Sequence, residues 1–587
     1  MSGLKRTHYC GELRKSDIGK EVTVCGWAAK QRDLGALIFI DLRDRTGVLQ
    51  LAFDDSTDKG IFEKAFAVRS EFVLMARGTV RERAAKNSDL PTGDVEVEVT
   101  ELRVLSQSET PPFEIAQNSQ TSEAVRLKYR YLDLRRPDLS GNMLLRHKIV
   151  KITRDFFDEE GFIEIETPML IKSTPEGARD FLVPSRMHNG SFYALPQSPQ
   201  LYKQLSMVAG FDKYMQIARC FRDEDLRADR QPEFTQIDLE MSFVDTQDVL
   251  DVVERYIKRL FKEAIDADIT LPLPRLTFSE AMEMYGSDKP DTRFEMKLYD
   301  LTDIVRDSGF SVFKSAVESG GSVRGITAKG AGLKLSRKEI DKLTDFVKGI
   351  GAKGLAWIRL TDESVTSSFG KFVSDDEMSG IIEKAGADTG DVVFIIGDAN
   401  NSHVLKTLGA LRLEVAKKIE IVGRGYNFLW ITQFPFFDYD EEQGQYVAMH
   451  HPFTSPMDEC LEYLETDKAR VRAKAYDLVL NGIELSSGSI RITDPKLQSR
   501  IFDLLGLSQE EASEKFGFLL EAFKYGAPPH GGMGIGLDRL VMQMIGCETL
   551  RDVVAFPKLQ NATEPMTQCP SKVDKEQLLE LGIKTID

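Results

Sequence analysis

The chain has 587 residues, with 42% hydrophobic and 29% charged residues, which is ordinary for a soluble globular protein of three or four domains. Its formal net charge of −17 excludes a general polyanion-binding surface, although a local basic patch or stacking groups can still bind RNA. The six cysteines contain no CxxC pair and no apolar run approaches membrane-spanning length, so we expect no zinc site, disulfide framework or membrane span, and a reducing cytoplasm fits.

Residues 1–106 predict a small β-barrel. Apolar alternation predicts strands at 22–29, 36–43, 48–53, 72–81 and 95–104, with a helix at 59–68 between the third and the fourth. Five strands with one such helix are typical of an OB-fold. The apolar row of the second strand points inward, which places Phe39 on the opposite, polar face. There its ring can stack on a nucleic-acid base, and a partly covered surface ring is the alternative.

Residues 107–140 predict a hinge, because they contain a proline pair and a strongly basic, tyrosine-containing stretch. This stretch can contact an RNA backbone or form a plain solvated helix. An amphipathic helix is predicted over residues 142–160, where Gly161 ends it. A strand broken by Pro168 follows over residues 162–170.

Residues 173–181 predict a loop that contains Glu176. The sequence after it predicts the start of a helix, with Pro199 in the first turn and with Gln200 and Lys203 on one helical face. By itself, the ordinary interpretation of Lys203 is an exposed helical lysine.

Two strands joined by a long polar loop occupy residues 214–243. Side chains alternate along a strand, so the second strand has one apolar row and one polar row. The polar row contains Gln236, Asp238 and Glu240, and it can simply be solvated. The loop is too long for a hairpin turn, and long loops in compact domains are usually functional or disordered. Arg222 and the charged loop beside these carboxylates suit a polyphosphate held through a metal ion.

The rest of the chain predicts a separate domain and further polar motifs. Residues 287–426 alternate strands and helices and predict an inserted α/β unit. His450 and His451 have no further ligand at metal spacing, so contact with a substrate is the better interpretation. Asp477 and Glu484 can reach one hard cation if the strand bends at the Asn-Gly pair between them.

A glycine-rich segment that ends at Gly536 permits close approach of the backbone to a ligand. The helix after it carries Asp538 and Arg539 in its first turns, where they can be a plain surface pair. Residues 559–587 predict a polar tail with one short helix.

The block FRDED followed by RQPEFTQIDLE resembles the second motif of class II aminoacyl-tRNA synthetases, and specifically that of the bacterial aspartyl-tRNA synthetases. Other blocks agree in order along almost the whole chain: the helix–strand–proline pattern resembles the first motif, GIGLDR the third, and PQSPQLYKQ the aspartate-specific pocket. Many family members have two glycines where Ser486 and Ser487 stand, which leaves the local backbone open.

The resemblance implies an α+β multidomain protein with an N-terminal OB-fold β-barrel, an antiparallel-sheet catalytic domain and an inserted α/β domain. The expected boundaries are 1–106 for the anticodon-binding barrel, 107–140 for the hinge, 141–286 and 427–558 for the two parts of the catalytic domain, 287–426 for the inserted domain and 559–587 for a C-terminal extension.

The reaction implied by the resemblance is the ligation of L-aspartate to the 3′ end of tRNA(Asp) by a homodimer, through aspartyl-adenylate, with ATP as substrate and Mg²⁺ as cofactor. Site residues follow from matching positions, with catalytic roles for Arg222 and Arg539. Contacts are implied with aspartate for Glu176, Gln200, Lys203, Arg222, Asp238, His450 and Arg491; with ATP for Arg222, Asp223, Glu224, Gln231, Glu484, Gly536, Leu537, Asp538 and Arg539; with Mg²⁺ for Asp477 and Glu484; and with the anticodon for Arg32, Phe39, Gln50, Arg83 and Glu96.

Three alternatives remain open. A relaxed enzyme would also charge tRNA(Asn), although Leu34 and Lys86 favour the strict form by family comparison. A related ligase that does not use tRNA would not need the barrel. A non-catalytic RNA-binding protein on the same fold would not need to retain the arginines and carboxylates of the site.

Overall fold

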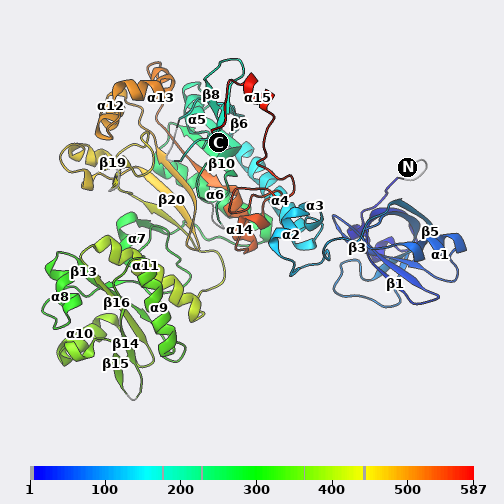
Figure 1. The fold of residues 1–587 in the computed structure, drawn as a ribbon, viewed down its shortest axis with the longest axis horizontal. Helices are drawn as coiled ribbons and strands as arrows, with labels where there is room; N and C mark the ends of the chain where they lie inside the picture. The colour runs from blue at the N-terminus through cyan, green and yellow to red at the C-terminus, as the bar shows by residue number, and fades with distance from the viewer. Residues whose placement is uncertain (1–4, 175–177, 226–228, 363, 441–443, 587) are drawn as a thin grey trace. The chain divides into compact units, whose positions relative to one another are not determined.

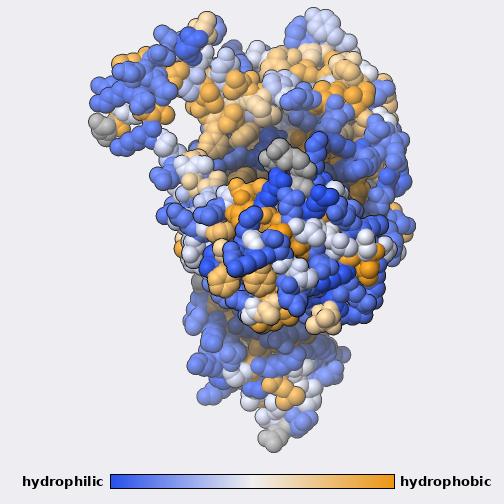
Figure 2. Space-filling model, turned by 90° about the vertical axis from the view of Figure 1, so that its right-hand side faces the viewer, coloured by the Kyte–Doolittle hydropathy of each residue, from blue (hydrophilic) through white to orange (hydrophobic). Residues whose placement is uncertain are grey.

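The computed structural model describes the chain except for residues 1–4, 175–177, 226–228, 363, 441–443 and 587. It forms two compact units, one with residues 1–148, 225–231 and 547–574, the other with residues 149–224, 232–546 and 575–587. Within the described residues, no helix is both long and apolar enough to cross a membrane. Hydrophilic residues dominate the face shown in Figure 2, where hydrophobic residues gather in separate patches.

The N-terminal strands close into a barrel, drawn in blue in Figure 1, in the order β1-β2-β3-β5-β4. The only parallel pair among them is β3 with β5. This arrangement confirms the predicted OB-fold. The elements are β1 (Glu21–Asp33), β2 (Ile38–Asp44), β3 (Gly47–Phe53), α1 (Lys59–Ala67), β4 (Val73–Glu82) and β5 (Val95–Ser106), with short 3-10 turns at Cys10–Glu12 and Lys15–Asp17.

The hinge consists of the helices α2 (Glu123–Lys128) and α3 (Arg130–Asp133), and the long helix α4 (Pro137–Glu159) follows. The helix α4 begins five residues before the predicted start, because proline is well suited to the first helical position. The solvated-helix interpretation of the hinge is wrong, since Arg130, Asp133 and Arg136 are buried and paired with one another.

The second unit is built on an eight-stranded sheet in the order β11-β17-β20-β21-β22-β10-β9-β6. Both end pairs are parallel and all other pairs are antiparallel. Its strands are β6 (Ile163–Glu164), β9 (Lys213–Phe221), β10 (Glu233–Ser242), β11 (Arg275–Thr277), β17 (Phe428–Thr432), β20 (Ala475–Leu480), β21 (Ile483–Ile490) and β22 (His530–Gly536). The predicted strand over 162–170 is wrong beyond Glu164, because the chain leaves the sheet before Pro168, which cannot donate to a ladder.

Helices surround this sheet, and two small hairpins extend from it. The helices are α5 (Gln200–Val208), α6 (Thr246–Ile265), α7 (Phe278–Tyr285), α12 (Pro495–Leu504), α13 (Gln509–Phe523), α14 (Leu537–Ile545) and α15 (Lys575–Glu580). The hairpins are β7 (Leu182–Pro184) with β8 (Phe192–Ala194), and β18 (Phe437–Asp440) with β19 (Gln445–Ala448). On one face of the sheet, Trp430 is fully buried and its indole donates to Glu254 of α6 at 3.0 Å.

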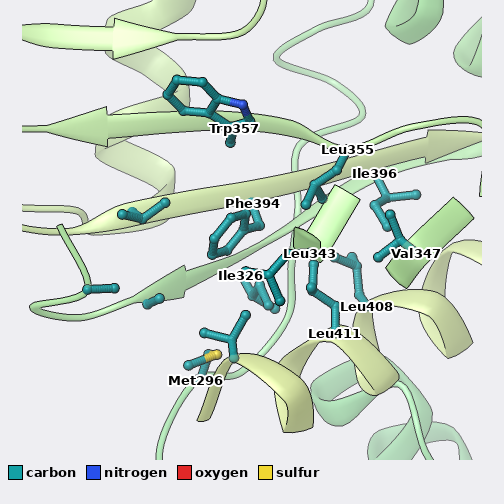
Figure 3. Close-up of a cluster of buried hydrophobic side chains, with 14 of the residues drawn as sticks. Met296, Ile326, Leu343, Val347, Leu355, Trp357, Phe394, Ile396, Leu408 and Leu411 are labelled. Carbon is teal, nitrogen blue, oxygen red and sulfur yellow. The ribbon is translucent and has the colours of Figure 1, made fainter. Parts of the chain in front are cut away.

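The inserted domain has a core on both faces of its own sheet, with strand order β12-β13-β16-β14-β15. Although strands and helices alternate, every strand pair is antiparallel. Figure 3 shows one of the two clusters, in which Phe394 and Ile326 of the sheet meet Leu408 and Leu411 of a covering helix. The elements are β12 (Tyr299–Asp300), α8 (Ser311–Glu318), β13 (Ser322–Ala328), α9 (Arg337–Gly349), β14 (Ala356–Leu360), β15 (Val365–Ser367), α10 (Asp375–Ala385), β16 (Val392–Asp398) and α11 (Asn401–Lys418).

Candidate active site

One row of side chains crosses the central strands of the large sheet on a single face. Register pairs align Asp477 of β20, Ser487 of β21, Gly534 of β22, Asp238 of β10 and Gln216 of β9. Paired residues in a sheet present their side chains to the same face. The face opposite to α6 therefore carries carboxylates and an amide, while glycine and serine between them leave room above the sheet.

Glycine in the central strand β22 is required by close approach of these polar groups. A Cβ atom at Gly534 would lie 3.1 Å from Asp238 Oδ2 and 3.3 Å from Gln236 Oε1. One at Gly532 would meet Glu240 Oε2 at 2.3 Å. The glycines thus leave room for three polar side chains of β10 beside their neighbouring strand.

The polar row of β10 is buried rather than solvated. Asp238 is 1% exposed and Glu240 is 0% exposed. Lys203 of α5 is also buried, and its Nζ donates to Asp238 Oδ1 at 2.5 Å and lies 3.4 Å from Glu240 Oε2. Both the solvated-row interpretation and the exposed-lysine interpretation are therefore wrong, because the lysine reaches down onto the carboxylates of the strand.

Arg491, directly after β21, completes a buried group of two cations and two carboxylates. Its Nε donates to Glu240 Oε1 at 2.8 Å and its second terminal nitrogen donates to Oε2 at 3.1 Å. Burial alone would raise the pKa of Glu240, but Arg491 and Lys203 together lower it. Burial raises the pKa of Asp238 in spite of Lys203. Asp238 Oδ2 is buried without a hydrogen-bond partner among the described residues, so it can still accept a donor from a ligand.

The two histidines differ in position. His451 Nε2 lies 2.7 Å from an Arg491 terminal nitrogen, and burial lowers the pKa of His451 well below its ordinary value. His450 packs edge-on against Phe434 and its Nε2 lies 3.5 Å from Asp477 Oδ1. The sequence assigned the substrate contact to His450, whereas the residue that contacts the buried cation is His451.

Asp477 and Glu484 are brought together by a tight hairpin, not by a bent strand. Asn481 and Gly482 both have positive φ, as a two-residue turn requires, and a bulge after Leu478 pairs Val479 with Glu484. Burial and the nearby Asp477 carboxylate raise the pKa of Glu484. Asp477 Oδ1 is buried with no hydrogen-bond partner among the described residues.

A pair of carboxylates with an unsatisfied oxygen fits a Mg²⁺ ion that takes its remaining ligands from substrate phosphates and water. Within the described residues, no group of three or more His, Cys, Asp or Glu side chains is arranged to hold a metal. The protein by itself thus offers two ligands and not a complete cage.

Arg222 lies directly past the end of β9. Its guanidinium carbon lies 5.2 Å from the centre of the Phe234 ring, and its Nε is buried without a hydrogen-bond partner among the described residues. Asp223 next to it pairs with Arg179 at 3.8 Å. Stacking on Phe234 holds a cation at the edge of the polar face with donors that a phosphate can take.

The three residues after Gly536 make different contacts. Leu537 is buried in the core, and Asp538 accepts the backbone N–H of Thr235 at 2.9 Å, which joins α14 to β10. The surface-pair interpretation is thus wrong for Asp538. Arg539 donates to the carbonyl of Glu484 at 3.2 Å, which places it beside the carboxylate pair.

Gln200, Gln231 and Glu176 are further predicted residues of the substrate sites. Gln200 is buried and donates to Gln204 at 3.0 Å. Gln231 belongs to the unit that contains the barrel, where its amide makes two bonds with the backbone of Lys558, at 2.8 and 3.1 Å. Glu176 lies outside the described residues.

The barrel brings its five predicted residues together. Gln50 accepts from Arg32 at 2.9 Å and from Arg83 at 2.8 Å, and it donates to Glu96 at 2.6 Å. The guanidinium carbon of Arg32 lies 5.8 Å from the centre of the half-buried Phe39 ring. Gln50, Arg83 and Glu96 are buried, whereas Arg32 is partly exposed.

Sequence reasoning missed the central role of Glu240. The alternation along β10 put it in the polar row, and two buried cations that converge on its carboxylate are visible only in three dimensions. His451, Ser489 and Phe234 were missed as well. Of these, Ser489 accepts from Arg491 at 2.7 Å.

We expect Glu240→Gln to lower the free energy of unfolding by about 3–5 kcal/mol, because Arg491 loses its carboxylate partner and the buried group is left with a net charge of +1. Glu233→Gln on the same strand, where Glu233 pairs with Arg219 at the surface, should cost about 1 kcal/mol or less. Urea unfolding would be measured with Trp27 and Trp357 replaced by phenylalanine, so that Trp430 reports on the sheet.

The same charge pairing predicts the pH dependence of this difference. Because the pKa of Glu240 is lowered in the folded state, its contribution is present above the ordinary carboxyl pKa and is lost as the pH falls through the lowered value. Equal effects of the Glu240 and Glu233 variants at neutral pH would contradict the central role given to Glu240.

Comparison with known proteins identifies the family. Residues 122–560 match the model of tRNA synthetases class II (D, K and N), and residues 22–105 match the OB-fold nucleic acid binding domain. An aspartate–tRNA ligase of Ruminiclostridium cellulolyticum is 58% identical over 99% of this chain and 98% of its own length. An aspartate–tRNA(Asp/Asn) ligase of Caldanaerobacter subterraneus is 57% identical over 100% of this chain and 99% of its own.

Solved structures share the fold at low identity. A putative aspartyl-tRNA synthetase of Leishmania major has a TM-score of 0.60 at 20% identity, with 95% of each chain covered. An asparaginyl-tRNA synthetase of Pyrococcus horikoshii complexed with asparaginyl-adenylate has a TM-score of 0.59 at 19% identity, with 94% of this chain and 98% of the other covered. With the family model matched over most of its length, and with relatives more than half identical from end to end, the chain belongs to the class II tRNA synthetases of the D, K and N group.

Proposed function

We propose that this synthetase activates L-aspartate with ATP and transfers the aspartyl group to the 3′ end of tRNA(Asp). The activity rests on the full-length relatives, and the buried pair Lys203 and Arg491 is the observation that supports aspartate as the amino acid. Two cations above a polar sheet face suit a ligand with a side-chain carboxylate.

The chemistry needs no protein nucleophile. An oxygen of the aspartate α-carboxylate attacks the α-phosphorus of ATP, the bond to the bridging oxygen of the β-phosphate breaks, and pyrophosphate leaves. A ribose hydroxyl at the end of the tRNA then attacks the activated carbonyl, and AMP leaves. The protein contributes positioning and stabilisation of charge, as in other phosphoryl-type transfers.

Each part of the site suits one part of the substrates. Asp238, with its uncommitted Oδ2, accepts the ammonium group of aspartate, together with Gln200 and Glu176. Arg222 on its Phe234 platform bridges the α-phosphate and the attacking carboxylate. Arg539 contacts the γ-phosphate.

The remaining assignments complete the nucleotide and amino-acid sites. By the family resemblance, Glu224 is assigned to the adenine side of ATP, Asp223 and Gln231 to ATP, and His450 to aspartate. Asp477 and Glu484 hold Mg²⁺, which would neutralise charge on the polyphosphate; their unsatisfied oxygen and mutual repulsion support this role.

We expect Arg491→Leu to reduce aspartate activation by roughly 10⁴-fold, because buried groups built for a polar ligand are left unpaired. Lys203→Leu should act in the same direction with a smaller loss, since only Arg491 offers a bidentate fork. The measurement is ATP–pyrophosphate exchange with aspartate and with asparagine.

Arg491→Lys retains the charge and checks that the loss is not simply unfolding. Arg500→Leu, which removes an exposed arginine paired with Glu465, is the matched control and should leave exchange unchanged. Near-normal aspartate kinetics in both the Arg491→Leu and Lys203→Leu variants would place selectivity elsewhere.

The barrel is proposed to bind the anticodon through Phe39, the partly exposed Arg32 and the buried residues Gln50, Arg83 and Glu96. The Nε atoms of Arg32 and Arg83 are buried without hydrogen-bond partners among the described residues, so donors remain for a base.

The relative named for both tRNA(Asp) and tRNA(Asn) supports a relaxed enzyme as the second candidate, while Leu34 and Lys86 favour the strict form.

We expect Phe39→Ala to weaken charging of purified tRNA(Asp) by about 1–3 kcal/mol, the worth of one stacked base, and to spare aspartate-dependent exchange. Phe66→Ala, which removes a ring that is 54% exposed elsewhere on the barrel, is the control. Wild-type charging of tRNA(Asn) in the same assay decides between the strict and relaxed forms. If Phe39→Ala lowers exchange as much as charging, the anticodon role is refuted.

A homodimer is proposed from the end of the large sheet. The edge strand β6 has only two residues, and the side chains of Ile163 within it and of Leu170 further along the chain are about half exposed. A second copy that covers this edge would bury them.

We expect sedimentation at micromolar concentration to show a dimer. Ile163→Asp should shift the equilibrium toward the monomer, because it places a charge in the interface. A monomeric wild-type protein would contradict the proposal.

A further inference from the structure

The barrel and the hinge meet at a buried ion group formed by Arg43, Glu71 and Arg135. Glu71 is 3% exposed, and both of its oxygens accept from Arg43 of β2, at 2.7 and 2.8 Å. Arg135, just past α3, donates to the same carboxylate at 2.8 Å. Its guanidinium carbon lies 4.8 Å from the centre of the Trp27 ring on β1. One hinge arginine thus contacts the barrel through a shared carboxylate and an aromatic ring.

The backbone at Glu71 is held in a costly conformation. Its φ of 64° is in the left-handed region, which non-glycine residues adopt at a cost of about 1–3 kcal/mol. Hydrogen bonds between Glu71 N–H and Ala28 O, at 2.8 Å, and between Ala28 N–H and Phe72 O, at 2.9 Å, attach this turn to β1. The fold therefore fixes the carboxylate at the place where Arg135 arrives.

Arg136, the next residue in the chain, belongs to a second set of contacts within the hinge. Asp133, fully buried on α3, accepts from Arg130 at 2.6 Å and from Arg136 at 2.9 Å. Arg130 also donates to the carbonyls of Arg551, Val554 and Ala555, at 2.6, 3.0 and 2.8 Å. The segment that contains these carbonyls continues to Lys558, whose backbone makes the two bonds to Gln231. The barrel is in this way connected to the loop that carries a proposed ATP contact.

We propose that Arg43, Glu71 and Arg135 form a latch that holds the barrel in one orientation on the hinge, with Arg135 as a positioning residue for tRNA charging. A tRNA bound to the barrel is then held at one angle to the hinge. Loss of the latch leaves anticodon binding and amino-acid activation intact, but the barrel then carries the bound tRNA at varying angles to the hinge, and charging becomes less efficient. The inference rests on the proposed function, since it requires that the barrel binds tRNA.

The test compares Arg135→Leu, Glu71→Gln and the double variant in two assays, aspartate-dependent ATP–pyrophosphate exchange and charging of tRNA(Asp). Each single variant should raise the KM for tRNA about 5–30-fold, the effect of one or two kcal/mol, and change exchange less than twofold. Since the two residues act through one contact, the double variant should be no worse than the poorer single variant. Arg135→Lys should restore part of the loss.

A matched control is Arg77→Leu, which removes a barrel arginine that pairs with Glu21 of the neighbouring strand at 2.5 Å and does not reach the hinge. Its KM for tRNA should change less than twofold. Glu71→Gln separates the latch from a direct contact between Arg135 and the tRNA backbone, because it frees Arg135. An unchanged or lower KM in Glu71→Gln would overturn the latch, and so would an equal loss of exchange and charging in Arg135→Leu. A wild-type protein without aspartate-dependent exchange would instead refute the proposed function.

Discussion

Four charges buried over the central sheet are the constraint on which the site depends. Lys203, Asp238, Glu240 and Arg491 have almost no contact with water, and in such surroundings an unpaired charge costs several kcal/mol. The group is neutral as a whole, since each cation faces a carboxylate. This balance fixes the positions of α5, β10 and the end of β21 relative to one another more strictly than apolar packing does, because a shift of either strand would separate the pairs.

The balance also explains the unusual composition of the neighbouring strands. β22 supplies glycine opposite Gln236, Asp238 and Glu240 of β10, and β21 supplies Ser487 and Ser489 on the same face. Ser486 points to the opposite face, toward the side covered by α6, which is why its hydroxyl is buried without a partner among the described residues. The two serines that stand where glycines are common thus face different environments, and only Ser487 belongs to the row of the site.

The alternation of apolar and polar residues was sufficient to predict which face of a strand each side chain is on, but not whether that side chain is buried. Alternation correctly put Asp238 and Glu240 on one face and Phe39 opposite the barrel core, because the period of a strand does not depend on its neighbours. The same rule could not show that the row of β10 is covered by α5, since Lys203 of this helix is 35 residues away from Asp238 in the sequence. It could not choose between His450 and His451 either, because adjacent residues outside regular structure have no fixed period.

Other differences have a similar origin. The helix α4 starts at Pro137 and continues through Gly141, because proline suits the first helical position and one glycine inside a helix is tolerated. The carboxylates Asp477 and Glu484 meet through pairing of two strands, although the linear spacing had suggested a bend within one. The hinge arginines look like a solvated basic stretch in one dimension, and their carboxylate partners become apparent only when the helices are folded together.

The inserted domain begins and ends at neighbouring points of its host. Asn427, at its end, donates to the carbonyl of Thr292, near its beginning, at 3.0 Å, and its backbone N–H donates to Asn481 at 2.9 Å. Closing a flexible loop costs conformational entropy, because its two ends must be held near each other. This cost rises by about 0.6 kcal/mol for each doubling of loop length. The inserted domain has its own core on both faces of its sheet, and its ends are already close together, so it adds almost none of this entropic cost. The more than one hundred residues between β11 and β17 therefore affect the pairing of these strands no more than a short turn would. The length of this segment can therefore change without a change in the register of the catalytic strands.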